Sequence, residues 1–337
     1  MDTIASVTRL SPNIVRVLGQ NPGKFTLQGT NTYLIGRHNP YTLVDTGEGK
    51  EAYIPALESA LKETAPSTNL ESPDVSDIII SHYHGDHVGG LPSVLALLRR
   101  LWDERKTGMP FKPPRLHKFP LATAQLPEWS NLPSIIDSLL PNSFTPASDE
   151  ATFHELYDGQ EFSTSSTSLR VLHTPGHTRD SICLFIPEDR ALYTADTVLG
   201  KGTAVFEDLK VYLSSLRKML DYHNSNSYDL LYPGHGPVVA KGAKLIETYI
   251  IHRSERDAHI LEVLQSPPPP SSGDSSGKAA WTTWTIVSKI YQSYPESLWA
   301  PASQGITLHM NKLEEDGLVK RLDGEGVHTS WGLNAKL

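Results

Sequence analysis

Apolar residues in the N-terminal part of the chain occur in short runs that are separated by turn-forming residues. Residues 14–18, 32–35 and 41–44 are three such runs, rich in β-branched and aromatic side chains. This pattern predicts three β-strands, and the second and third are close enough in sequence to form a hairpin around residues 37–40. Residues 77–80 are almost entirely apolar, which is typical of a strand buried on both faces.

Other segments repeat their apolar residues at intervals of three or four, which predicts amphipathic helices. In one of them Leu213, Leu216 and Leu220 lie on a single face. The predicted helices are 54–63, 91–102, 209–222 and 243–265, and further strands are predicted at 169–172, 181–186, 191–194 and 229–232. Strands that alternate with helices indicate an α/β core.

Residues 103–168 interrupt this regular pattern. Prolines recur throughout the segment, and no apolar periodicity extends across it. Because proline removes a backbone donor and fixes φ, long helices and central strands are disfavoured there. The sequence therefore predicts a loop-rich insertion with a short helix at 134–140.

The C-terminal part is separated from the rest by a run of prolines followed by serine and glycine. Such a run predicts an extended or flexible linker, at residues 266–278, between a domain at 1–265 and a domain at 279–337. The smaller domain is predicted to contain helices at 285–293 and 303–316 and a hairpin at 318–331. Two helices followed by a hairpin are typical of a winged-helix-like module.

The composition limits the kinds of protein that this chain can be. It has 337 residues, 38% of them hydrophobic, which is enough for one large core and a smaller second domain. No apolar run reaches the roughly 18 residues of a transmembrane helix, so we expect no membrane span. Cys183 is the only cysteine and the N-terminus lacks the pattern of a secretory signal, so we expect an intracellular protein.

The densest group of metal-binding residue types directly follows the predicted strand 77–80. His82, His84, Asp86 and His87 lie within six positions. His82 and His84 alternate, so both side chains can project to one side at the end of the strand. Imidazole and carboxylate groups are the ligands expected at a catalytic zinc site, whereas a histidine-rich surface turn is the alternative interpretation.

Three further candidates lie at other junctions between a strand and a loop. His177 and His235 each follow a Pro-Gly pair, and Asp196 follows the predicted strand 191–194. A Pro-Gly pair makes a tight turn that fixes the direction of the next side chain. Each residue alone would be explained as a structural side chain, but together with the first cluster they indicate a metal centre.

The combination of His-x-His-x-Asp-His, Pro-Gly-His, an isolated Asp and Gly-His-Gly resembles the signature of the metallo-β-lactamase superfamily. Other stretches resemble its endoribonuclease branch, the β-lactamase-like protein 2 family in the glyoxalase II-like group; they are residues 15–19, 26–34, 169–172, 199–209, 232–238 and 313–317. The resemblance covers nearly the whole chain except the region from about 103 to 168. It implies a four-layer αββα sandwich and a metal-dependent hydrolase.

The resemblance also implies a role for each candidate residue. The ligands would be His82, His84 and His177 for one Zn²⁺ ion, Asp86, His87 and His235 for a second, and Asp196 as the bridge between the two ions. Paired cations would lower the pKa of a bound water from about 15.7 toward 7. Asp86 would in addition act as the catalytic residue that accepts a proton from the resulting hydroxide. His173 is expected to end the preceding strand and not to bind metal.

The resemblance to the endoribonuclease branch implies that single-stranded RNA is the substrate, with the tail domain helping to hold the strand. From Lys278 onward, however, the tail has six basic and six acidic side chains, without the positive excess of a typical nucleic-acid-binding domain. The tryptophans at 281, 284, 299 and 331 could stack on bases, although a small core would use such residues equally.

Two other functions stay open. Residues 19–33 also resemble fungal thioesterases that release polyketides from carrier proteins, and a net charge of −8 suits an acyl thioester better than RNA. Residues 203–209 favour the ribonuclease branch instead. A non-catalytic, metal-binding scaffold protein is the third alternative, but no ligand position has been lost. A di-iron electron-transfer protein is disfavoured because that group has a carboxylate where His84 stands.

The chain departs from both close groups at several positions. Tyr83 replaces a common tryptophan, and Ala195 replaces the glycine that usually precedes the bridging aspartate. The insertion at 103–168 is longer than in relatives, and we expect it to border the substrate cleft. From the resemblance we expect the protein in the mitochondrial matrix or the cytoplasm, and we expect no membrane partner. A homodimer is compatible with the resemblance.

Overall fold

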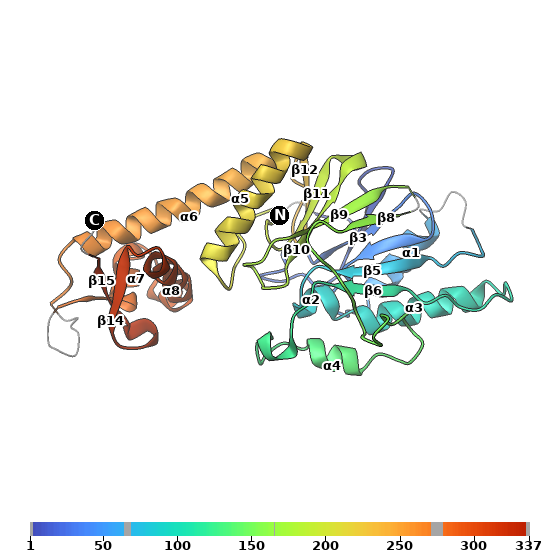
Figure 1. Ribbon diagram of the computed structural model, residues 1–337, viewed down its shortest axis with the longest axis horizontal. Helices are drawn as coiled ribbons and strands as arrows, with labels where there is room; N and C mark the ends of the chain where they lie inside the picture. The colour runs from blue at the N-terminus through green and yellow to red at the C-terminus, as the bar shows by residue number, and fades with distance from the viewer. Residues whose placement is uncertain (1–2, 64–68, 165, 271–278, 335–337) are drawn as a thin grey trace. The chain divides into compact units, whose positions relative to one another are not determined.

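A computed structural model describes residues 3–63, 69–164, 166–270 and 279–334 of the chain (Figure 1). The chain forms two compact units, the first made of Met1–Phe206 and Ser214–Ile246 and the second of Glu207–Leu213 and Glu247–Leu337. Of the predicted linker 266–278, the part from 271 onward lies outside the described residues.

The first unit contains a seven-stranded sheet in the order β1-β2-β3-β4-β5-β6-β7. Its strands are β1 (Val7–Arg9), β2 (Ile14–Leu18), β3 (Asn31–Ile35), β4 (Tyr41–Val44), β5 (Val75–Ile80), β6 (Arg115–Lys118) and β7 (His154–Glu155). Neighbouring strands are antiparallel from β1 to β4 and parallel from β4 to β7. The predicted hairpin is therefore present as β3 and β4.

A second sheet in the same unit has five strands in the order β12-β11-β10-β9-β8. Its strands are β8 (Glu161–Ser163), β9 (Ser168–His173), β10 (Ile182–Ile186), β11 (Ala191–Ala195) and β12 (Leu230–Pro233), with a 3-10 turn, η2 (Pro187–Asp189), between β10 and β11. Only the pair of β11 and β12 is parallel. As a result β9, β11 and β12 run in one direction and end at one edge of the sheet.

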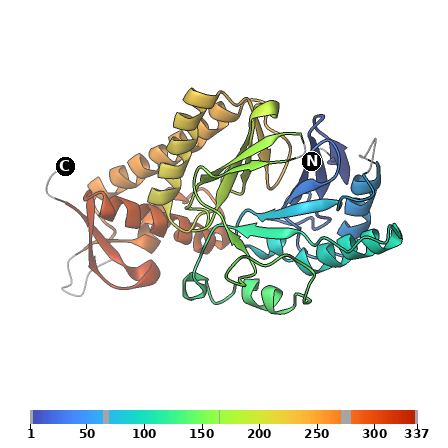
Figure 2. The same ribbon diagram turned by 45° about the vertical axis from the view of Figure 1, so that its right-hand side comes forward.

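Alternate residues of the first sheet point to opposite faces, and each face packs on a different partner. Leu34 and Ile78 belong to the core shared with α1 (Tyr53–Glu63) and α3 (Leu91–Glu104). Tyr33 and Ile79 belong instead to the core between the two sheets. In Figure 2 the green strands of the second sheet lie beside the blue strands of the first. The apolar run at 77–80 thus fills both cores, as its composition predicts.

The helix α5 (Leu209–Asn226) covers the outer face of the second sheet. The Phe185 ring of β10 contacts the Tyr222 ring of this helix, with 5.3 Å between the ring centroids. Layers of helix, sheet, sheet and helix follow one another in Figure 1. The predicted four-layer αββα sandwich is therefore confirmed.

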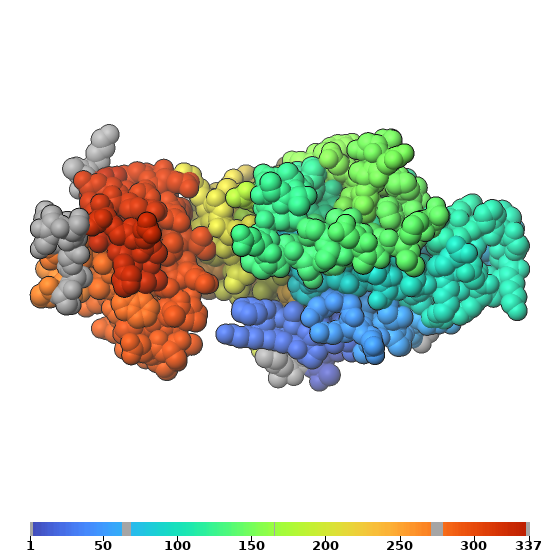
Figure 3. Space-filling view, turned by 90° about the horizontal axis from the view of Figure 1, so that it is seen from below, coloured from blue at the N-terminus to red at the C-terminus, as the bar shows by residue number. Residues whose placement is uncertain are grey.

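The segment 103–168 is more regular than its prolines predict. It contains the 3-10 turn η1 (Thr123–Gln125) and the helix α4 (Leu132–Asp137), and its strands β6, β7 and β8 extend both sheets. The sequence analysis missed these strands because β6 is polar. Its His117 contacts Asp77, and Lys118 forms a buried ion pair with Asp180. Figure 3 shows the green atoms of this segment spread over one face of the first unit.

The second unit contains the winged-helix domain that the sequence predicts at 279–337, and it also includes part of the chain that is predicted to belong to the first domain. Besides the main part of α6 (Gly242–Gln265) it contains β13 (Trp281–Thr282), α7 (Thr283–Ile290), η3 (Glu296–Leu298), α8 (Trp299–Glu315), β14 (Val319–Asp323), η4 (Gly326–His328) and β15 (Ser330–Leu333). The three strands form a sheet in the order β13-β15-β14.

Tryptophans supply much of the core of this domain. Trp281 and Trp331 are buried among Ile286 and Met310, and the Trp331 indole donates to Thr283 Oγ1 at 2.9 Å. Burial of this kind favours the structural interpretation for these two tryptophans over base stacking. Among the described residues, no helix has both the length and the apolar character needed to cross a membrane.

Candidate metal centre

The candidate ligands lie where strands of the first unit end. His82 and His84 follow β5, and a single helical turn, α2 (Gly85–Val88), then carries Asp86 and His87. The other three candidates follow strands of the second sheet; they are His177 after β9, Asp196 after β11 and His235 after β12. Because these strands end at the same edge of the sandwich, residues distant in sequence meet there.

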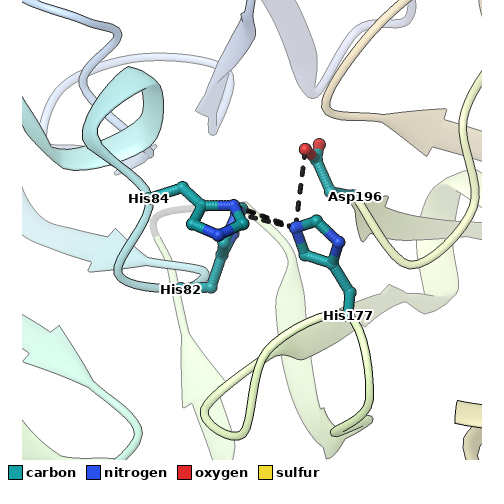
Figure 4. A group of neighbouring side chains, drawn as sticks. All are labelled: His82, His84, His177 and Asp196. Atoms are coloured by element: carbon teal, nitrogen blue, oxygen red, sulfur yellow. Dashed lines mark hydrogen bonds and ion pairs between the residues drawn. The ribbon is translucent and has the colours of Figure 1, made fainter. Parts of the chain in front are cut away.

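Three imidazoles converge on one point in this region (Figure 4). His84 Nδ1 lies 3.1 Å from His82 Nε2 and 3.0 Å from His177 Nε2, and the two Nε2 atoms are 3.3 Å apart. Asp196 approaches the same point, with 3.7 Å between Asp196 Oδ2 and His177 Nε2. Ligand atoms of these four residues all lie within 4.8 Å of one another.

A second group forms beside the first one. His235 Nε2 lies 3.2 Å from Asp86 Oδ2, and His87 Nε2 lies 3.3 Å from the same oxygen. Asp196 reaches this group as well, with its Oδ1 atom 3.4 Å from His87 Nε2 and its Oδ2 atom 3.1 Å from His235 Nε2. The structure thus brings all seven candidates together and places Asp196 between the two groups, where the predicted bridging role requires it.

Hydrogen bonds fix which ring nitrogens face the centre. His87 Nδ1 lies 2.7 Å from Asp45 Oδ2, and His177 Nδ1 lies 2.8 Å from the carbonyl oxygen of Val205. An acceptor at Nδ1 holds the proton on that atom, so the Nε2 lone pair of each ring points inward. Neutral imidazoles with inward lone pairs are the form that binds a metal cation.

Asp45 is a residue of the site that the sequence analysis missed. Its buried carboxylate accepts hydrogen bonds from the Ser81 backbone N–H and the Ser81 hydroxyl, each at 2.8 Å, and from the Tyr193 hydroxyl. Since the Ser81 hydroxyl donates to Asp45, it accepts from His82 Nδ1 at 2.9 Å. Asp45 therefore orients His87 directly and His82 through Ser81. An aspartate immediately after the buried strand β4 was the available signal.

The electrostatics differ between the two groups in the absence of cations. Burial, with the neighbouring imidazoles, lowers the pKa of His82 well below its ordinary value and that of His84 to about 3. Burial also disfavours a proton on His235, but the Asp196 and Asp86 carboxylates outweigh it and raise the pKa of that imidazole to about 9. His82 and His84 are therefore neutral at pH 7, whereas His235 holds a proton.

The donor set fits a pair of divalent cations. His82 and His177 hold their protons on Nδ1, so their Nε2 atoms, 3.3 Å apart, cannot hydrogen-bond to each other. His87 Nε2 and Asp196 Oδ1 are buried without a hydrogen-bond partner. Buried polar atoms are normally paired, so unpaired ones that converge on a point indicate a bound ion. Nitrogen and carboxylate oxygen donors of this kind suit zinc.

The loops around the centre leave little room for change. A Cβ atom on Gly234 would lie 2.3 Å from Asp196 Oδ1, so only glycine fits before His235. The Asn31 amide donates to the carbonyl oxygens of Pro233 and Gly236, each at 2.9 Å, and thereby holds this turn. Asn31 belongs to the stretch 26–34 noted in the sequence, and its contacts join that stretch to the turn that carries His235.

Two further residues that the sequence analysis singled out, His173 and Ala195, are not candidate ligands. His173 stacks on Phe119 with 3.7 Å between ring centroids, and its Nε2 contacts the Arg179 carbonyl oxygen at 2.9 Å, so it does not face the centre. Ala195 has a φ of 44°, in the left-handed region that favours glycine. The backbone turns there and directs Asp196 inward, at a cost of about 1–2 kcal/mol for the alanine side chain.

A pocket of about 680 Å³ opens above the two groups. Its lining includes His84, Asp86, His177, Asp196 and His235. We call the outer part of this pocket the rim, and it consists of Lys24, Phe25, Trp129, Lys201 and Val205. Phe25 and Trp129 are 71% and 66% exposed, and Val205 is 59% exposed, which is unusual for such large apolar side chains.

Comparison with known protein families gives two matches. Residues 25–235 match the metallo-beta-lactamase superfamily, and residues 282–331 match the beta-lactamase associated winged helix domain. The first match includes all seven candidate ligands, and the second lies within the winged-helix unit.

Individual relatives extend over nearly the whole chain. A beta-lactamase-like protein 2 homolog of Drosophila melanogaster is 34% identical over 321 residues, which cover 95% of this chain and 94% of the relative. An atrochrysone carboxyl ACP thioesterase of Aspergillus novofumigatus is 31% identical over 86% of this chain and 74% of its own length. A beta-lactamase domain protein from Burkholderia ambifaria has the same fold, with a TM-score of 0.68 at 17% identity over 99% of this chain and 96% of that one.

Proposed function

Because this chain belongs to the metallo-beta-lactamase superfamily, we propose that it is a dinuclear zinc hydrolase that cleaves single-stranded RNA. Two zinc ions held by the residues of the centre would supply a water of lowered pKa and neutralise charge on a phosphoryl oxygen. His82, His84 and His177 would hold one ion, Asp86, His87 and His235 the other, and Asp196 would serve both.

Asp86 has the position and the ionisation state of a proton acceptor. Burial alone would raise the pKa of Asp86, but His87 and His235 outweigh that effect and keep the pKa well below its ordinary value. The carboxylate is therefore ionised throughout the neutral range and can accept a proton. The Thr30 hydroxyl donates to Asp86 Oδ2 at 2.9 Å and fixes its direction toward the pocket.

The charge of the rim is the observation that carries the choice of RNA. The chain has a net charge of −8, yet the described residues that line the pocket include no carboxylate other than Asp86 and Asp196. Lys24 and Lys201 stand at the rim instead. Two lysines around a divalent metal centre attract a polyanion locally even though the whole surface does not. The exposed rings of Phe25 and Trp129 provide faces on which unpaired bases stack.

Thioester hydrolysis is the second candidate. It is supported by the likeness to the fungal thioesterase and by the apolar side chains of the rim, which an acyl chain would also contact. The lysines of the rim count against it, because a neutral acyl group gains nothing from them. A scaffold protein without activity is less well supported, since the seven candidate residues lie in two groups that could each hold a metal ion.

One experiment separates these functions. The purified, zinc-loaded protein is incubated with an end-labelled single-stranded RNA, with the same RNA in a duplex, and with an acyl thioester. Asp86→Ala removes the proposed proton acceptor, and His259→Ala, in an exposed histidine of α6, is the matched control. Cleavage of the single strand that is lost only in Asp86→Ala supports the proposal. Turnover of the thioester alone overturns it in favour of the second candidate.

A further inference from the structure

Trp129 is the described residue of the segment 103–168 that lines the pocket at the metal centre. We propose that its indole is a stacking platform for one unpaired base of the substrate, and that it makes the site selective for single strands. This inference rests on the proposed ribonuclease function and names the part of the site that recognises the substrate.

The position of Trp129 supports this role. Its ring centroid lies 5.5 Å from that of His84, and the two planes are inclined by 37°. Tyr83, which directly precedes His84 in the chain, also supports the indole, with 5.8 Å between the two ring centroids. Because His84 belongs to the first metal group, a base on the exposed face of Trp129 would lie within about one nucleotide of a phosphate at the cations.

The backbone beneath Trp129 is held firmly although the side chain is exposed. Leu132 and Ile135 of α4 are buried in the core formed with α1 and α3, which fixes the helix that follows the tryptophan. A Cβ atom on Gly85 would lie 2.9 Å from the Asn131 amide nitrogen, so this segment packs directly on the metal-binding turn. An exposed tryptophan on a fixed backbone loses little conformational entropy when it binds a flat ligand.

The lining of the pocket includes a second exposed aromatic ring. Phe25 is 71% exposed, and Lys24 Nζ lies 5.5 Å from the centroid of its ring. Its loop ends at Thr30, which donates to Asp86 in the second metal group. Trp129 is therefore linked to the first metal group and Phe25 to the second. A strand whose scissile phosphate lies at the cations would place one base toward each ring, and the lysines of the rim would face its phosphates.

This arrangement excludes duplex RNA for a physical reason. Bases in a duplex are stacked on their neighbours and have no free face, so they cannot contact Trp129 unless they are first unstacked. An unpaired base gains the stacking interaction without that loss. Selectivity for single strands therefore follows from the exposed indole and needs no hydrogen bond to a particular base.

The test uses three variants of the full-length, zinc-loaded protein. Trp129→Ala removes the platform, Trp129→Phe keeps an aromatic face, and Tyr157→Ala removes an aromatic side chain that is 64% exposed but does not line the pocket. KM and kcat are measured on a single-stranded RNA and on versions of it with one abasic position each. The acyl thioester of the preceding experiment is assayed in parallel.

The expected result is a rise in KM of about five- to 100-fold in Trp129→Ala, from the loss of one base–aromatic stack, with kcat nearly unchanged. Trp129→Phe should recover most of the loss, and Tyr157→Ala should behave as the parent protein. One abasic position should impair the parent protein but not Trp129→Ala, because the base and the indole act as a pair.

Two results overturn the inference, and they are distinguishable. If Trp129→Ala cleaves RNA with the KM of the parent protein, the stacking role is wrong while the ribonuclease proposal stands. If the parent protein cleaves no RNA and hydrolyses the thioester, the ribonuclease proposal fails and base recognition fails with it. A fall in kcat together with loss of bound zinc in Trp129→Ala would assign the indole to the support of His84 and would also overturn the inference.

Discussion

The seven candidate ligands and the rim form one pocket but are built in different ways. The ligands follow β5, β9, β11 and β12, are mostly buried, and are oriented by hydrogen bonds to residues such as Asp45. The rim residues lie on loops, are largely exposed where they are apolar, and include charged groups that face solvent. The difference indicates that the ligands determine the chemistry and that the rim determines the substrate.

The comparison predicts that changes in the ligands should affect metal binding and turnover, whereas changes in the rim should affect substrate binding. The largest effect is expected for Asp196→Ala, because this carboxylate approaches both metal groups. Activity should fall by about 10⁴-fold or more, as for a member of a catalytic unit, and bound zinc should fall below two ions per chain. Metal analysis and turnover on the same sample test this. Retained activity with two bound ions would contradict the bridging position.

The ligands should also respond to pH in a way that the rim does not. The carboxylates raise the pKa of His235 to about 9 in the metal-free protein, so below that pH a bound cation must displace a proton. Cation affinity should therefore rise by about tenfold per pH unit between roughly pH 6.5 and 9 for this one proton. The stabilisation that the charged imidazole gives the metal-free protein is present below about pH 6.5 and is lost as the pH rises through 9.

Calorimetric titration with zinc in buffers of different ionisation enthalpy measures this proton release. Lys112→Ala is the control, because this exposed lysine lies outside the pocket and is not a candidate ligand. A cation affinity that is independent of pH would show that His235 binds no proton that competes with the metal.

Asp45→Asn should have a smaller effect that is confined to metal binding. The amide has one acceptor oxygen where the carboxylate has two. It cannot accept both from the Ser81 backbone N–H at Oδ1 and from His87 and the Ser81 hydroxyl at Oδ2, so the two imidazoles lose their fixed orientation. Loss of such an outer partner typically lowers metal affinity by about 10- to 100-fold. Asp229→Asn, in an exposed ion pair with Arg190, is the matched control. Equal zinc affinities in the two variants would contradict the role given to Asp45.

The smallest effect is expected at the charged residues of the rim. Lys24→Ala and Lys201→Ala should each raise KM for RNA by a few-fold and leave kcat and zinc content unchanged. Each should reduce the slope of log KM against log salt concentration by roughly 0.7, as expected for one phosphate contact to a single strand. Lys112→Ala, in an exposed lysine outside the pocket, is the control. An unchanged slope in both rim variants would show that these lysines do not contact phosphate.

The ligands could be predicted from the sequence because their signals are local. His82 and His84 directly follow an apolar strand, and His177 and His235 follow Pro-Gly turns. Their residue types and their spacing along the chain were therefore enough to identify them as candidate ligands. The fold followed from the same strands, whose apolar runs fill the cores on both faces of the first sheet. The interpretation of these residues as zinc ligands stays a prediction until metal is measured.

The rest could not be predicted because it depends on contacts between distant segments. Asp45 is an ordinary aspartate in sequence and becomes important only when β4 and β5 lie side by side. The strand β6 could not be recognised from its sequence because His117 and Lys118 are polar. Both side chains are paired with carboxylates from other segments, which only the structure shows. Trp129 lies among prolines, and only the packing of α4 on the core brings it to His84.

Every candidate ligand follows the end of a strand, and this has a consequence for how such a protein can change. Segments that leave one strand end and return to another can grow, shrink or be exchanged while the strands keep the cation positions in place. The connection between β6 and β7, residues 119–153, is one such exchangeable piece, and it delivers Trp129 to the pocket. A chimera that carries a relative's connection in its place should keep its metal content and acquire a different substrate range. The architecture thus allows the substrate range to change while the metal centre, and with it the type of reaction, is kept.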